Sequence, residues 1–154
     1  MPAKTEISVR STAFNHGDPI PAVYTCEGRN ESPPLAWTAP QQAAGLALIV
    51  DDPDAPSGLF THWVVSNIPP ATTSTEEGQT PAGGVVSLNS ADRAEYFGPC
   101  PPAGTGTHHY RFIVYALSHP VRVDSQTAPA DARSAIVDAS MGDGRLIGTY
   151  TVDG

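Results

Sequence analysis

Residues 98–117 read GPCPPAGTGTHHYRFIVYAL, and they combine an irregular loop with the clearest β-strand of the chain. Residues 98–106 hold three prolines and three glycines, which excludes a regular helix or strand there. From residue 110 onwards, successive side chains alternate between two faces of an extended chain. One face carries Tyr110, Phe112, Val114 and Ala116, and the other carries Arg111, Ile113, Tyr115 and Leu117. This period of two predicts a strand over residues 110–117.

Elsewhere the apolar residues form short clusters between turn residues. The continuous run Leu46–Val50 is typical of a strand buried on both faces, and Pro53 and Pro56 would end it. Further strands are predicted over residues 5–14, 60–67, 85–88 and 146–152. Residues 15–44 are dense in turn residues, and residues 71–84 are expected to form a surface loop.

One convincing helix is predicted late in the chain. It would begin at Thr127 or Ala128, because Pro129 suits the first turn of a helix. Apolar residues then recur with helical spacing, at Ala132, Ala135, Ile136 and Ala139. Gly142 or Gly144 would end the helix. The sum is a mainly β chain with one or two short helices.

The composition excludes several classes of function. The chain of 154 residues has 8 Lys and Arg residues against 16 Asp and Glu residues, which gives a net charge of -8. A duplex nucleic-acid binder normally carries a basic surface, so we expect no nucleic-acid partner. An anionic membrane surface would repel the chain, and its longest apolar stretch is far below the ~20 residues of a membrane span. No phosphate-binding loop or nucleophile elbow is present, and we expect neither a cofactor nor a metal.

The start of the chain, MPAKTEISVRSTAF, has no apolar segment typical of a secretory signal. We therefore expect a cytoplasmic location. Two cysteines, Cys26 and Cys100, could form one bridge, but free thiols are the expectation for a cytoplasmic protein. Cys100 lies between two prolines and is interpreted as a small spacer, or as a reactive thiol if a nearby imidazolium lowers its pKa.

Two proline-bounded segments concentrate the side chains that could perform chemistry. In the first, DDPDAP at residues 51–56 precedes His62 at the start of a predicted strand. In the second, GPCPPAG at residues 98–104 precedes His108 and His109. An imidazole can donate hydrogen bonds to an anion, and a neighbouring carboxylate can orient it. His108 and His109 are adjacent on a strand and should point to opposite faces, so they should not share a metal ion.

These residues carry a family resemblance. DDPDAP with HWVVSNIP at residues 62–69, and the stretch 98–117, resemble the two signature blocks of the phosphatidylethanolamine-binding protein family. YTCEGRNESPPLAW at residues 24–37 resembles the bacterial branch of that family, often labelled Raf-kinase-inhibitor-like. The resemblance covers nearly the whole chain. It implies one domain over residues 1–154, built from two antiparallel sheets in a Greek-key arrangement, with a small anion pocket at one end.

The resemblance also implies which residues form that pocket. The expected ligand-binding residues are Asp52, His62, Gly98, Pro99, His108 and Tyr110. Asp52 would be the pocket carboxylate with Asp54 as its partner in the same turn, and Gly98 and Pro99 would form the opposite wall. Members of the bacterial branch are often homodimers, so we expect a homodimer here.

The chain departs from the family pattern at two places. The family usually has Arg where this chain has His109, so a salt bridge made by that Arg is in doubt. The long C-terminal helix of the eukaryotic members has no counterpart, because the chain ends four residues after Tyr150. Contacts that this helix makes to a head group or to a kinase are therefore not expected here.

Three functions follow as hypotheses. The first is a binding protein for a small anion of the phosphate monoester or phospholipid head-group type. The second is an enzyme in which His108 acts as acid or base and Asp52 orients it. The third is an inhibitor of a kinase or another protein partner, which binds through the rim of the pocket.

Overall fold

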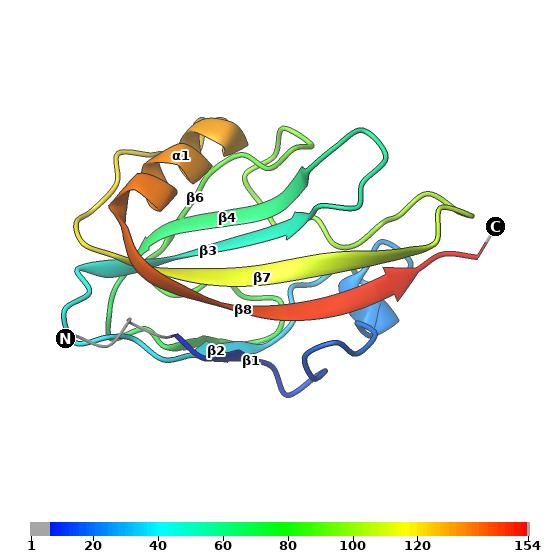
Figure 1. The fold of residues 1–154 in the computed structure, drawn as a ribbon, viewed down its shortest axis with the longest axis horizontal. Coiled ribbons are helices and arrows are strands. Elements are labelled where there is room, and N and C mark those ends of the chain that lie inside the picture. Colours follow the sequence, from blue (N-terminus) through cyan, green and yellow to red (C-terminus); the bar gives the residue numbers. More distant parts are fainter. Residues whose placement is uncertain (1–6, 154) are drawn as a thin grey trace.

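The computed structural model describes residues 7–153, and its strands form two antiparallel sheets (Figure 1). The larger sheet has five strands in the order β6-β4-β3-β7-β8, and the smaller has three in the order β1-β2-β5. The bounds in the larger sheet are β3 Gly45–Asp52, β4 Phe60–Ile68, β6 Val85–Val86, β7 Thr107–Leu117 and β8 Ser140–Thr151. The bounds in the smaller sheet are β1 Val9–Arg10, β2 Leu35–Trp37 and β5 Ser74–Thr75. A short 3-10 helix, η1 (Ala22–Tyr24), and one α-helix, α1 (Pro129–Ala139), complete the elements.

The larger sheet is the middle layer of the structure, with α1 on one face and the smaller sheet on the other (Figure 1). The alternation predicted in β7 is confirmed, because Phe112 and Val114 pack toward the smaller sheet while Ile113 packs toward α1. β3 is buried along its whole length, as its continuous apolar run predicts. The mainly β fold with two antiparallel sheets is therefore confirmed.

The smaller sheet is the part of the fold that the sequence predicts least well. The strand predicted over residues 5–14 is reduced to β1, and residues 5 and 6 lie outside the described part of the chain. β2 lies in the region predicted as turns, and β5 lies in the predicted surface loop. Strands of two or three residues are too short to show a period, so the turn residues around them dominate the pattern.

The predicted end of α1 is wrong. The helix has Ala128 as its N-cap residue and Pro129 in its first turn, as expected, but it ends at Ala139 and β8 begins at the next residue. Gly142 and Gly144 lie inside β8. A Cβ atom at residue 144 would lie 1.7 Å from the carbonyl oxygen of Ile7, so the close approach of the N-terminal segment requires a glycine there.

A buried ionic cluster joins α1 to the larger sheet. Asp51 is fully buried on the α1 side of β3 and accepts hydrogen bonds from Nε and Nη2 of Arg111 at 2.6 and 3.0 Å. Nη2 of Arg133, on α1, donates to the same carboxylate at 2.8 Å. Two guanidinium groups thus neutralise one buried carboxylate, as a buried charge requires.

No helix within residues 7–153 is long and apolar enough to cross a membrane.

Candidate functional site

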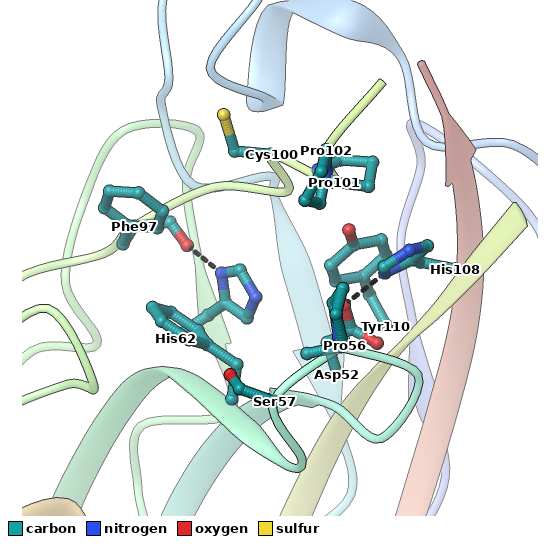
Figure 2. A pocket seen from close by; sticks show the side chains of 12 residues that line it. Asp52, Pro56, Ser57, His62, Phe97, Cys100, Pro101, Pro102, His108 and Tyr110 are labelled. Carbon is teal, nitrogen blue, oxygen red and sulfur yellow. Dashed lines mark hydrogen bonds and ion pairs between the residues drawn. The ribbon is translucent and has the colours of Figure 1, made fainter. Parts of the chain in front are cut away.

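Three strands bring polar side chains together at one end of the larger sheet. β3 ends at Asp52, and its two neighbours, β4 and β7, begin at Phe60 and Thr107. Both neighbours run antiparallel to β3, so the end of β3 lies beside the starts of both. A cavity of about 290 Å³ lies there (Figure 2). It is lined by Asp52, Ala55, Pro56, Ser57, Phe60, His62, Phe97, Cys100, Pro101, Pro102, His108 and Tyr110.

Four of the six predicted binding residues are among these lining residues, namely Asp52, His62, His108 and Tyr110. Each comes from the strand end at which the sequence places it. His108 and Tyr110 are two positions apart on β7 and therefore share a face, and their rings stack with centroids 6.3 Å apart. The predicted opposite orientation of His108 and His109 is confirmed, because His108 is buried and His109 is exposed.

Asp52 and His108 form a buried pair in the cavity wall. Nδ1–H of His108 donates to Oδ2 of Asp52 over 2.7 Å, while Oδ1 of Asp52 accepts from the backbone N–H of Asp54. On the other side of the ring, the hydroxyl of Thr105 donates its single proton to the carbonyl oxygen of Pro102. The Thr105 oxygen must therefore accept from Nε2–H of His108, at 2.9 Å. In this arrangement both ring nitrogens of His108 make hydrogen bonds inside the protein, one to Thr105 and one to the Asp52 carboxylate.

His62 presents one free ring nitrogen to the cavity. Its Nδ1–H donates to the carbonyl oxygen of Phe97 at 2.6 Å, which fixes the proton on that nitrogen. Burial lowers the pKa of His62 below its usual value, against the opposing effects of this hydrogen bond and of the Asp52 charge. Near neutral pH the ring is therefore neutral, and Nε2 carries a lone pair. Nε2 points into the cavity and contacts no hydrogen-bonding partner among residues 7–153 (Figure 2).

Tyr110 presents the second free polar atom. Its side chain is fully buried, and its hydroxyl makes no well-formed hydrogen bond within residues 7–153, although the Asp52 carboxylate lies close enough to affect it. Burial, followed by the nearby negative charge of Asp52, raises the pKa of Tyr110, so the hydroxyl keeps its proton and remains a donor. Buried hydroxyl groups in native proteins are almost always paired. This atom is therefore the clearest candidate contact for a bound molecule.

The remaining wall is largely apolar and aromatic. The rings of Phe60 and His62 have centroids 4.7 Å apart, and Phe97 lies 5.8 Å from both. Pro101 and Pro102 face them from the loop before β7 (Figure 2). The cavity thus combines a small polar centre with room for an apolar group, which is the usual pattern of a small-molecule site.

Gly98 and Pro99 are buried next to the cavity and are not among its lining residues. The N–H of Gly98 donates to Oδ1 of Asn30 at 2.8 Å, and the carbonyl oxygen of Pro99 accepts from the N–H of Cys26. A Cβ atom at residue 98 would lie 2.3 Å from Oδ1 of Asn30. The glycine thus allows the close approach of the residue 24–30 segment, and the neighbours of Gly98 and Pro99 supply the wall itself.

The prediction of free thiols at Cys26 and Cys100 is wrong. The two residues form a disulfide with Cα atoms 5.4 Å apart, across 74 positions of sequence. The prediction rested on the absence of a secretory signal, which says nothing about which loops meet in space. The fold brings the segment after η1 against the loop before β7, and this loop forms one side of the cavity.

His109 keeps a link between the turn after β3 and β7. Oδ2 of Asp54 accepts from both the backbone N–H and Nδ1–H of His109, each at 2.8 Å. These hydrogen bonds lower the pKa of Asp54 below its usual value. Both side chains are about half exposed, so the link contributes little to stability. At the position where the family usually has Arg, this chain thus forms an Asp54–His109 contact.

Several residues of the site are not predicted from the sequence. Phe60 could be found, because it lies two positions before His62 on one strand and therefore shares its face. Phe97 and Thr105 carry no comparable signal, since both lie in irregular segments. Within residues 7–153, no group of three or more His, Cys, Asp or Glu side chains could hold a metal ion.

Known proteins of one family resemble this chain in sequence and in fold. The chain is 50% identical over 149 residues to LppC of Mycobacterium tuberculosis, a protein named as a lipoprotein, and the match covers 97% of this chain and 74% of that one. The structure superposes with a TM-score of 0.91 on YbcL of Escherichia coli, described as a member of the mammalian PEBP family, at 30% identity and with 97% and 100% of the two chains covered. It superposes with a TM-score of 0.88 on a PEBP homolog from Chlamydia trachomatis, at 35% identity and with 96% and 99% covered. The family description that matches residues 10–151 is "Phosphatidylethanolamine-binding protein". The chain therefore belongs to the phosphatidylethanolamine-binding protein family.

Proposed function

We propose that this protein binds a small anionic group of the phosphate monoester type, either in a free metabolite or in a lipid head group. The observation that carries the proposal is the buried hydroxyl of Tyr110, which is a donor without a partner beside the cavity-facing Nε2 of His62. A phosphate oxygen accepts the Tyr110 proton. A protonated phosphate oxygen donates to Nε2 of neutral His62, and a fully ionised one binds after His62 takes up a proton.

The charges around the cavity favour a singly charged group over an amine. Asp52 is the only carboxylate among the described lining residues, and both its oxygens already accept hydrogen bonds. An ammonium group would therefore meet no unpaired carboxylate. A proton on both ring nitrogens of His108 would balance the charge of Asp52, and the anion would then meet little net repulsion. Recognition of phosphatidylethanolamine, after which the family is named, would then depend on the phosphate of the lipid and not on its ethanolamine.

Binding of phenyl phosphate, measured by titration calorimetry, tests this proposal. Phenyl phosphate offers a phosphate to the polar centre of the cavity and a ring to its apolar wall. We therefore expect saturable binding that is stronger than the binding of inorganic phosphate, and only weak binding of phenol. Vesicles that contain phosphatidic acid, compared with vesicles of phosphatidylcholine alone, separate a lipid source from a soluble one. No binding of phenyl phosphate and no binding to phosphatidic acid vesicles would overturn the proposal.

The enzyme hypothesis gains no support from the contacts around His108. Both of its ring nitrogens already make hydrogen bonds within the protein, so neither is free to exchange a proton with a ligand. The inhibitor hypothesis depends on a protein partner, and no feature described among residues 7–153 supports one. Binding without turnover is therefore the function that we propose.

We also propose a homodimer, as the resemblance to the bacterial branch implies. Light scattering at micromolar concentration should give twice the 16.1 kDa mass of one chain, and a particle of 16.1 kDa at all concentrations would contradict the dimer.

The cytoplasmic location stays a prediction. The Cys26–Cys100 disulfide is typical of an oxidising compartment, and LppC is named as a lipoprotein. Cell fractionation with alkylation of free thiols decides between the cytoplasm and an oxidising compartment.

A further inference from the structure

The Cys26–Cys100 disulfide adjoins the cavity and is open to solvent. Cys100 is one of the lining residues, and both Cys26 and Cys100 are exposed residues. In Figure 2, the Cys100 side chain points away from the centre of the cavity while Pro101 and Pro102 face it. A soluble thiol can therefore reach the disulfide without entering the cavity.

The wall segment 99–102 depends on this disulfide because it has few other means of attachment. Three of its four residues are prolines, which lack a backbone N–H and cannot donate hydrogen bonds. The attachments on either side are hydrogen bonds, from Gly98 to Asn30 and from Gly104 to the carbonyl oxygen of Val152. Between them, the hydrogen bond from the Cys26 N–H to the Pro99 carbonyl and the bonds from the N–H and hydroxyl of Thr105 to the Pro102 carbonyl hold the backbone. The disulfide adds a covalent link from the wall to the segment after η1.

The same segment controls the polar centre through one chain of contacts. The carbonyl oxygen of Pro102 accepts the proton of Thr105, whose oxygen accepts from Nε2–H of His108. Displacement of Pro102 would free the Thr105 hydroxyl to rotate, and His108 would lose the partner that completes its hydrogen bonding. A change at residue 100 thus reaches both the apolar wall and the Asp52–His108 pair.

We propose that Cys26 and Cys100 form a redox-sensitive modification site that sets the anion affinity of the cavity, and this inference rests on the proposed function. The reaction partner is a dithiol. One thiolate of the dithiol attacks a sulfur of the disulfide to give a mixed disulfide, and its second thiol displaces the protein thiol. The protein gains two electrons and two protons as two thiols, and the dithiol leaves as a cyclic disulfide. The oxidised protein binds anions, and the reduced protein binds them weakly.

The test compares phenyl phosphate binding to the oxidised protein, to the protein reduced with dithiothreitol, and to the double variant Cys26→Ser/Cys100→Ser. Reduction frees at least one residue of the wall that the ligand must then order, so we expect affinity to fall by about tenfold or more. The double variant should bind as weakly as the reduced protein, and dithiothreitol should not change it further. Reoxidation of the wild-type protein should restore the original affinity.

Hydrogen exchange provides a readout that does not need a ligand. After reduction, the amides of residues 100 and 103–107 should exchange faster, while those of β3 should not change. Equal affinity of oxidised and reduced protein would overturn this inference and leave the proposed function intact. Global unfolding on reduction, seen as faster exchange in β3, would also overturn it, because the effect of the disulfide would then not be confined to the cavity wall. Absence of binding to the oxidised protein would overturn the proposed function and this inference together.

Discussion

Asp52 and His108 lie 56 positions apart in sequence, yet the Asp52 carboxylate accepts the Nδ1–H of His108 over 2.7 Å in the interior of the protein. Their side chains are only 4% and 2% exposed. The contact joins the end of β3 to the start of β7, and the Thr105 hydroxyl completes the hydrogen bonding of the His108 ring. The pair is therefore part of the framework of the cavity as well as of its wall.

Truncation of His108 should destabilise the protein strongly. His108→Ala leaves the Asp52 carboxylate buried without its partner, and we expect a loss of about 3–5 kcal/mol in the free energy of unfolding. In a chain that already carries Asp52→Asn, the same truncation leaves no charge behind and should cost clearly less. Urea denaturation of the four proteins in this double-mutant cycle measures the difference. Equal costs of the truncation in both backgrounds would show that the pair is not charged.

The contribution of His62 to the stability of the ligand-free protein should fall on mild acidification. Burial lowers the pKa of His62 in the folded state, whereas the unfolded chain has the usual value near 6.5. As the pH falls below about 6.5, the unfolded state binds the proton first, so the free energy of unfolding decreases until the folded pKa is passed. His62→Gln should remove this contribution. Urea denaturation between about pH 7.5 and 5 should therefore give a smaller loss for the variant, and an identical loss would contradict the assignment.

Anion binding should have the opposite pH dependence. A bound anion favours protonated His62, so affinity should increase as the pH falls through and below the usual histidine range. Phenyl sulfate is a suitable probe, because its single charge does not change over this range. Calorimetry at several pH values should show stronger binding at acidic pH together with proton uptake. Affinity that stays constant from acidic to alkaline pH would rule out a role for His62 protonation.

Much of the larger sheet can be predicted because its strands are long enough to show a pattern. The apolar run of β3 and the alternation of β7 give both the strands and the faces to which their side chains point. The strand ends then place Asp52, His62, His108 and Tyr110 near one another. The smaller sheet has strands of two or three residues, which are stabilised by pairing partners far away in the sequence. No local pattern specifies them.

The contacts that complete the site depend on loops, and loops are where prediction from sequence fails. The disulfide requires that residue 26 meets residue 100, and the spacing of two cysteines does not contain that information. The hydrogen bonds of Thr105 and Phe97 follow from how the proline-rich loop folds back on the sheet. Likewise, Gly144 is required by the passing N-terminal segment and not by the end of a helix.

The comparison of Tyr110→Phe with Tyr96→Phe tests the central claim most directly. Tyr110→Phe removes a buried hydroxyl that has no partner in the described structure, so the free energy of unfolding should not fall. Tyr96 is not among the residues that line the cavity, and Tyr96→Phe removes a hydroxyl that donates to the carbonyl oxygen of Tyr24 at 2.8 Å, which should cost about 1 kcal/mol of stability. Phenyl phosphate affinity should fall by about ten- to a hundredfold in Tyr110→Phe, which loses a hydrogen bond to a charged group, and should be unchanged in Tyr96→Phe. Unchanged affinity in Tyr110→Phe would contradict the proposal that this cavity binds the anion through the Tyr110 hydroxyl.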